Sequence, residues 1–261
     1  MKIFLGLSNI AGQLHDFEKG FQSLGLETMT AVHRSKKMLP GATYDYNLET
    51  DVPSLFRYPK TPIGKGIRRI YKKQLLKKIW MKALRECDIF LFMWSTFQPD
   101  NSDLELLKKH GKKVVIYLVG SALRWIPATN QEFALHGIAP VDYDYDHSLK
   151  ELESKLIHIR RCEKYADVLF STPNQSSLSL RPYKTFLVPI DLEKFQNKPQ
   201  QRKDNPIVVH AASKADIKGS QYVAEVFERL KNEGIRFQPK IIEGIPYKEV
   251  LKLYQDCDIL V

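Results

Sequence analysis

The stretch that decides the fold is residues 206–230, which read P-I-V-V-H-A-A-S-K-A-D-I-K-G-S-Q-Y-V-A-E-V-F-E-R-L. It predicts a buried strand over Ile207–Ala211, a polar loop with two lysines, and a helix that opens at Gly219. Residues 241–261, I-I-E-G-I-P-Y-K-E-V-L-K-L-Y-Q-D-C-D-I-L-V, continue a second strand into a second helix and a third strand. A basic, glycine-bearing loop at a helix N-terminus favours phosphate, because unpaired N–H groups and the helix dipole attract anions.

The rest of the chain repeats this alternation of strands and helices. Three segments share a helix end, a small residue, an aspartate and an apolar strand: Leu84–Phe90, Lys164–Phe170 and Tyr254–Leu260. Earlier strands are expected over Ile3–Leu7, Thr28–Val32, Ile89–Phe92, Val114–Val119, Val168–Ser171 and Thr185–Val188. The pattern predicts an α/β protein with two Rossmann-like, doubly wound domains of parallel sheet.

The polar stretch Asn197–Asn205 predicts a linker, with domains over residues 1–195 and 196–261. The second domain would have three strands and two helices, whereas an open α/β domain usually needs about 100 residues or more. We therefore expect the second domain to be incomplete, in a fragment or a shortened form of a longer protein.

Composition limits the class of protein further. The 261 residues are 43% hydrophobic, and no window approaches the roughly 18 apolar residues of a membrane span. The N-terminus lacks the pattern of a signal peptide, so a cytoplasmic protein is expected. The three cysteines (Cys87, Cys162 and Cys257) lack metal-ligand spacing, so we expect reduced, structural thiols and no metal site.

The net charge of +10 comes from one stretch. Arg57–Lys82 contains ten Lys and Arg residues and no acidic residue, and the remaining chain has 30 of each sign. An amphipathic helix is expected over residues 64–86, with basic residues on one side and apolar residues on the other. It could dock on an anionic membrane surface, or pack on the core with a solvated basic face. Nucleic-acid binding is not expected, because no recognised module accompanies the charge.

The segment Ser213–Gly219 (S-K-A-D-I-K-G) resembles the donor-site loop of GT-B glycosyltransferases, specifically the retaining family-4 type. The resemblance implies that Lys218 contacts the donor diphosphate, that Lys214 supports it and that Gly219 lets the backbone approach closely. It also implies metal-independent catalysis, with a nucleotide-diphosphate sugar as donor and no separate cofactor. The alternative is that both lysines only solvate a loop.

A second pattern is Asp103–Val115 followed by Gly120-Ser121-Ala122-Leu123-Arg124. It is similar to the D-L-x-L-L-K-x-x-G-K-K-V-V … H-G-S-D-x-R pattern of a subgroup tied to cell-surface polysaccharides. The resemblance implies that Gly120, Ser121 and Arg124 lie at the acceptor side or in the cleft, although Arg124 could equally form a surface ion pair. The chain departs from the pattern at Val119, where the family has a histidine that faces the transferred sugar, and at Ala122, where it has an aspartate.

Other segments of the chain resemble the same family more weakly. Asn9-Ile10-Ala11-Gly12 resembles the acceptor-side loop, which implies a role for Gly12, but it also fits any strand–turn–helix start. Leu187–Phe195 resembles the crossover into the second domain, and Glu243 would lie near the nucleotide base. The family's E-x7-E carboxylates would lie beyond the third strand of that domain, so we expect no transfer by this chain alone.

The resemblance implies a retaining glycosyltransferase that acts on a cell-envelope polysaccharide or a lipid-linked acceptor, at the inner face of the cytoplasmic membrane. The alternative is an eroded, non-catalytic α/β protein that binds a membrane or a partner through the basic helix.

Overall fold

A computed structural model describes residues 1–10, 12–34, 42–57, 60–140, 147–172, 178–186, 188–191, 203–212, 215 and 218–261. The chain divides into two compact units, Met1–Ile190 and Asp191–Val261. The domain boundary expected between residues 195 and 196 lies outside the described residues, so that boundary stays a prediction. The two units are described separately below.

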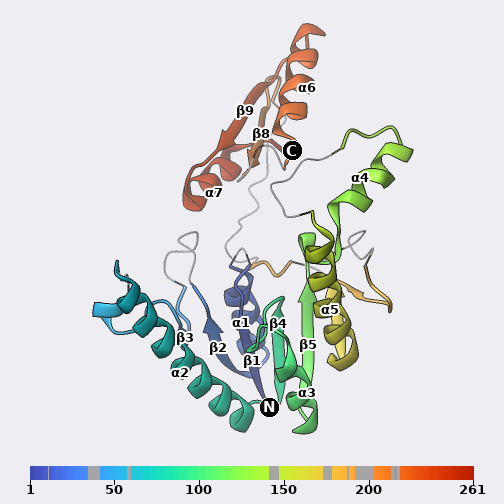
Figure 1. Ribbon diagram of the computed structural model, residues 1–261. Helices are drawn as coiled ribbons and strands as arrows, with labels where there is room; N and C mark the ends of the chain where they lie inside the picture. Colours follow the sequence, from blue (N-terminus) through green and yellow to red (C-terminus); the bar gives the residue numbers. More distant parts are fainter. Residues whose placement is uncertain are drawn as a thin grey trace. The chain divides into compact units, whose positions relative to one another are not determined.

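The first unit is built on a parallel sheet with seven strands in the described residues (Figure 1). They are β1 (Lys2–Leu7), β2 (Glu27–Val32), β3 (Tyr46–Asn47), β4 (Ile89–Met93), β5 (Lys113–Leu118), β6 (Val168–Ser171) and β7 (Lys184–Thr185). Their order in space is β3-β2-β1-β4-β5-β6-β7. This is the order of a Rossmann-type sheet, in which the winding reverses between β1 and β4. The predicted α/β fold class is confirmed.

Helices cover both faces of this sheet. The helical segments are α1 (Gln13–Ser23), η1 (Ser54–Phe56), α2 (Pro62–Glu86), α3 (Ser102–Lys109), η2 (Gly120–Leu123), α4 (Ile126–Leu135) and α5 (Leu149–Tyr165). Successive strand side chains point to opposite faces. Phe90 and Phe92 therefore join the core beneath α2, α3 and α5, whereas Leu91 and Met93 join the core beneath α1. The α4 helix was not expected from the sequence.

The aspartate of the repeated sequence pattern has the same role in three places. Asp88, Asp167 and Asp258 each precede a strand. Their carboxylates accept the backbone N–H of Lys2, Val114 and Ile207, respectively, at 2.9, 2.8 and 2.8 Å. Their own N–H groups donate back to the carbonyls of the same three residues. Each aspartate thus closes a ring of two hydrogen bonds that fixes the register where one strand meets its parallel neighbour.

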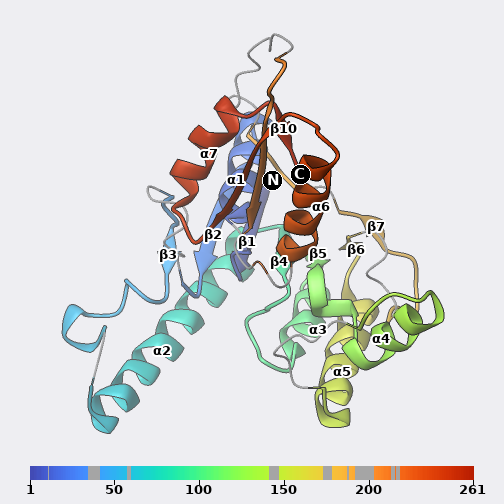
Figure 2. The same cartoon turned by 90° about the horizontal axis from the view of Figure 1, so that it is seen from above.

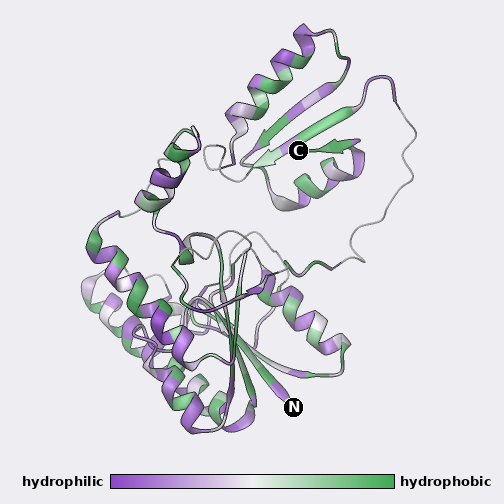
Figure 3. Ribbon diagram, turned by 90° about the vertical axis from the view of Figure 1, so that its right-hand side faces the viewer, coloured by the Kyte–Doolittle hydropathy of each residue, from purple (hydrophilic) through white to green (hydrophobic). Residues whose placement is uncertain are grey.

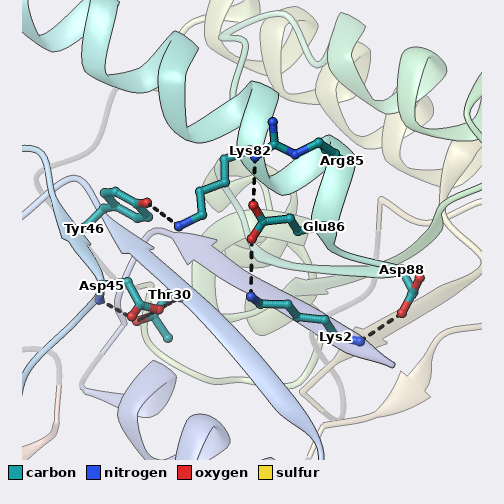
Figure 4. Close-up of polar contacts among 8 residues, drawn as sticks. All are labelled: Lys2, Thr30, Asp45, Tyr46, Lys82, Arg85, Glu86 and Asp88. Carbon is teal, nitrogen blue, oxygen red and sulfur yellow. Dashed lines mark hydrogen bonds and ion pairs between the residues drawn. The ribbon is translucent and has the colours of Figure 1, made fainter.

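Helix α2 packs on the core of the first unit through its C-terminal half, whereas its N-terminal half contacts η1, where the Tyr71 and Phe56 rings stack at 5.7 Å between centroids. Thr61 caps the helix by accepting the Gly64 N–H at 3.1 Å. At the other end, Lys82 donates to the Tyr46 hydroxyl at 3.2 Å and Glu86 pairs with Lys2 at 3.4 Å (Figure 4). Figure 2 shows the helix running outward from the sheet.

The apolar stripe expected along α2 is accordingly only half buried. Ile79 and Ala83 are fully buried, but Ile70 and Tyr71 are 59% and 40% exposed. Among the described helices, α2 included, none is long and apolar enough to cross a membrane.

The second unit is a smaller parallel sheet, with β8 (Ile207–Ala212), β9 (Gln238–Glu243) and β10 (Ile259–Leu260) in the order β10-β8-β9. Its helices are α6 (Ser220–Asn232) and α7 (Tyr247–Asp256). The crossover through α6 runs from β8 to β9, and the one through α7 runs back past β8. Right-handed crossovers in opposite directions put the two helices on opposite faces, as Figure 3 shows. The winding therefore reverses at β8, whose carboxyl end leads into α6.

Candidate functional site

The sequence-predicted donor residues gather at the carboxyl edge of the second sheet. Gly219 stands directly before α6 with φ 67°, in the left-handed region that glycine tolerates best. Lys218 precedes it and is exposed, with no ion-pair partner among the described residues. The Ser220 N–H donates to the Ala215 carbonyl at 3.0 Å and closes the loop. Lys214, the predicted supporting cation, lies outside the described residues.

Glu243 lies at the same edge, because it ends β9 and is paired in register with Ala212 of β8. Its Oε1 accepts the Ala215 N–H at 3.1 Å. The structure therefore gives Glu243 a definite role in holding the loop between β8 and α6. Its predicted place beside a nucleotide base remains a prediction.

A buried His210–Ser220 contact beneath this loop was missed from the sequence. His210 Nε2 lies 2.9 Å from Ser220 Oγ, and His210 Nδ1 lies 3.0 Å from the Val261 carbonyl oxygen. A carbonyl oxygen can only accept, so Nδ1 carries the proton and Nε2 accepts from the serine hydroxyl in the neutral ring. This contact ties β8, β10 and the first residue of α6 together. The sequence feature that could have indicated this contact is a histidine within an apolar strand, I-V-V-H-A-A.

In the first unit, a pocket of about 520 Å³ lies beside the point where the winding of the sheet reverses. It is lined from the carboxyl ends of β1, β4 and β5 by Ser8, Trp94 and Val119, and from later segments by Ala122, Arg124, Trp125, Glu151 and Lys155. Ligands of open α/β sheets usually bind in this crevice. We call it the switch-point pocket.

Some of the predicted acceptor-side residues line this pocket and others do not. Arg124 lines it, together with Val119 and Ala122, the two positions at which the chain departs from the family pattern. Gly120 (φ 64°) and Ser121 begin η2 between them, although the Ser121 side chain lies outside the description. Gly12 instead caps α1 in the left-handed region and does not line the pocket.

Several side chains of the pocket wall are charged or polar. Lys155 pairs with Glu151 at 2.9 Å and donates to the Arg124 carbonyl at 2.9 Å. Within the described part of the chain, Arg124 Nε, Trp125 Nε1 and Glu151 Oε2 are enclosed but have no hydrogen-bond partner. Buried polar atoms normally find partners. Arg124, Glu151 and Lys155 give the pocket wall both positive and negative charge.

Trp94 forms one edge of this pocket in an unusual backbone conformation. Its φ is 69°, which is costly for a bulky residue. Its ring lies 4.1 Å from the ring of His158, and burial lowers the pKa of His158 to about 4. Strained residues of this kind cluster at binding sites, where the surrounding fold holds them.

No group of three or more His, Cys, Asp or Glu residues in the described segments is arranged to hold a metal ion. The three cysteines are free and buried, as expected for structural thiols. Burial raises the pKa of Cys87 to about 11 and that of Cys162 to about 12.

No protein-family model and no curated protein matches the sequence significantly. The solved structures to which the chain is similar include two of Os79 from O. sativa. The first, in complex with UDP, has a TM-score of 0.49 and 11% identity over 95% of this chain and 73% of that chain. The second, with UDP and deoxynivalenol-3-glucoside, has a TM-score of 0.48 and 12% identity over 99% and 71%. Similarity at this level assigns no family and no activity, so we base the proposal below on the chain's own residues.

Proposed function

We propose that this chain belongs to a GT-B glycosyltransferase of the retaining type, with a nucleotide-diphosphate sugar bound in the second unit and an acceptor in the first. The observation that carries the proposal is the junction of β8 and α6. There the exposed Lys218, which forms no ion pair within the described residues, stands directly before the left-handed Gly219, at the point where the winding reverses. The same residues carry the sequence resemblance.

The proposed chemistry needs stabilisation of a departing diphosphate. The bond between the sugar's anomeric carbon and the diphosphate oxygen breaks, an acceptor hydroxyl oxygen bonds to that carbon, and the hydroxyl proton is released. Lys218 and the positive end of the α6 helix dipole would bind the developing negative charge without a metal ion or another cofactor. Glu243 would keep the loop in place through its bond to Ala215.

The proposed acceptor is a cell-envelope polysaccharide or a lipid-linked sugar, held by the switch-point pocket. Attachment to the inner face of the cytoplasmic membrane is part of the proposal. Segment η1 and the outer half of α2 support it, because Leu55 of η1 and Ile63 and Ile70 of α2 are exposed beside the basic residues of the Arg57–Lys82 stretch. Sedimentation with anionic but not neutral vesicles, weakened by salt, is the expected result. Binding that salt does not affect would contradict an electrostatic attachment.

Nucleotide binding tests the central proposal. Titration calorimetry with UDP, GDP and ADP should detect at least one diphosphate, and Lys218→Ala should weaken binding by roughly tenfold or more, as expected for one charge-assisted contact. Lys231→Ala is the matched control, because Lys231 lies at the far end of α6 and pairs with Glu228. Equal affinity of Lys218→Ala and the unmodified chain would refute the donor site.

The second candidate is a non-catalytic binding protein derived from such an enzyme. Val119 and Ala122 favour it, because both line the switch-point pocket with hydrocarbon where the family has a histidine and an aspartate. If no nucleotide diphosphate binds while the pocket still binds an oligosaccharide, this second candidate replaces the first.

A further inference from the structure

A second, larger groove lies in the first unit between α2 and the segments that follow β2 and β4. It encloses about 900 Å³ and we call it the α2 groove. Its α2 wall includes Arg69, Lys72, Lys73, Leu76, Lys77 and Trp80, with Met81 beside them. These positions are spaced by three and four residues, so they form one continuous face of the helix. From Arg69 to Lys77 this face spans about 12 Å at 1.5 Å per residue.

The four cations of this face are only partly offset within the described residues, where Glu49 acts on Lys72. None of them has an ion-pair partner there, although basic residues elsewhere in the unit do, such as Lys108 with Asp167 and Lys155 with Glu151. Burial and, next, the charge of Arg68 lower the pKa of Lys72, whereas Glu49 opposes this shift. Like charges held together around a concave surface create a positive potential that favours an anion.

The opposite wall of the groove contains a further polar atom that has no hydrogen-bond partner within the described residues. His33, which follows β2, and Trp94, which follows β4 in its left-handed conformation, both line the groove. His158 also lines it, and its Nε2 is enclosed with no hydrogen-bond partner in the described part of the chain. The acidic side chain next to this wall, Asp103, is already engaged by the Thr96 hydroxyl at 2.7 Å and the Phe97 N–H at 2.8 Å. It therefore does not neutralise the four cations of α2.

We propose that the α2 groove binds a phosphate-bearing ligand, with its phosphate or diphosphate oxygens on the cationic face of α2. A single carboxylate offers one charge and two oxygens, too few for cations spread over about 12 Å. A diphosphate offers more charge and more oxygens, and lysine binds phosphate as a point charge. Leu76, Trp80 and Phe97 supply apolar surface for the remainder of the ligand. The inference concerns the first unit alone and holds whether or not the second unit binds a nucleotide.

The groove contains its own reporters, because Trp80 and Trp94 line it and Trp125 does not. The full chain would be titrated with inorganic pyrophosphate while tryptophan fluorescence is recorded. A second arm uses phosphatidylcholine vesicles with and without phosphatidic acid, which distinguishes a lipid headgroup from a soluble phosphate. The variants are Lys77→Gln, which alters the groove, and Lys78→Gln, which removes an equal charge from the next, exposed position outside it.

Binding of pyrophosphate that Lys77→Gln weakens by roughly tenfold and Lys78→Gln leaves unchanged is the expected result. The same contrast seen only with phosphatidic acid vesicles also supports the proposal and identifies a lipid as the source of the phosphate. Equal weakening by both variants would overturn it, because a diffuse charge and not the groove would then attract the anion. Absence of binding in both arms would overturn it as well. Circular dichroism spectra confirm that both variants are folded.

Discussion

Replacing Asp167 by alanine tests whether the repeated aspartates stabilise the sheet. The Asp167 carboxylate accepts the Val114 N–H at 2.8 Å and pairs with Lys108 at 2.7 Å and Lys113 at 3.3 Å. A hydrogen bond to a charged group contributes about 1.5–3 kcal/mol, and a partly exposed ion pair contributes under about 1 kcal/mol. The side chain is 25% exposed, so water can replace part of what is lost. We therefore expect Asp167→Ala to lower the free energy of unfolding by about 2 kcal/mol.

Two further variants separate the hydrogen bond from the charge. Asp167→Asn keeps an oxygen that can accept the Val114 N–H, so a loss of about 1 kcal/mol is expected. Glu153→Ala is the control, because Glu153 is exposed on α5 and forms no hydrogen bond or ion pair in the described residues; its effect should stay within about 0.5 kcal/mol. Urea unfolding followed by circular dichroism measures all three. If Asp167→Ala unfolds like Glu153→Ala, the carboxylate does not hold the register.

The pH dependence follows from the same contacts. Burial acts to raise the pKa of Asp167, but the hydrogen bonds from Lys108, Val114 and Lys113 outweigh it and lower the pKa overall. A carboxylate with a lowered folded-state pKa stabilises the protein above its unfolded-state pKa of about 3.9. The difference between the unmodified chain and Asp167→Ala should therefore shrink as the pH falls from that value through the folded-state pKa. A difference that stays constant would contradict this reasoning.

Three further predictions concern single residues. Gly219→Val should destabilise the second unit by about 1–2 kcal/mol in a thermal melt, because its φ is 67° and a Cβ would lie 3.3 Å from Tyr222, whereas Gly219→Asn should cost less. Burial lowers the pKa of His158 in the folded chain to about 4, whereas in the unfolded chain the ring binds a proton near pH 6.5. The stability should therefore fall as the pH drops from about 6.5 to 4. His158→Phe should flatten this part of the urea-midpoint profile, and an unchanged slope would refute the assignment. Cys87 and Cys162, with raised pKa values of about 11 and about 12, should react with iodoacetamide at about pH 8 at least roughly tenfold more slowly in the folded chain than in urea, and equal rates would contradict their burial.

The local elements could be predicted from the sequence because their signals are local. The long strands of both sheets, the helix expected over residues 64–86 and found over Pro62–Glu86, and the placement of Gly219 at the start of α6 all follow from hydrophobic period and glycine position. Two elements, α4 and β3, were not predicted from the sequence. Helix α4 has no clear apolar stripe, and β3 has only two residues, so neither carries enough periodicity to be recognised.

The sites depended on contacts between distant parts of the chain. The switch-point pocket is lined by residues that follow β1, β4 and β5, such as Ser8, Trp94 and Val119. Their spacing along the chain does not indicate that these strands are neighbours in the sheet. The His210–Ser220 contact likewise depends on where α6 begins relative to β8.

The sequence by itself determined the α/β alternation, the aspartate before three of the strands and the concentration of positive charge in one helix. The tertiary structure decided what these features do, because strand order and helix tilt set which side chains meet. It showed that each aspartate binds the backbone of a neighbouring strand. It also showed that the cationic face of α2 lines a groove, since only the C-terminal half of that helix is held by the core.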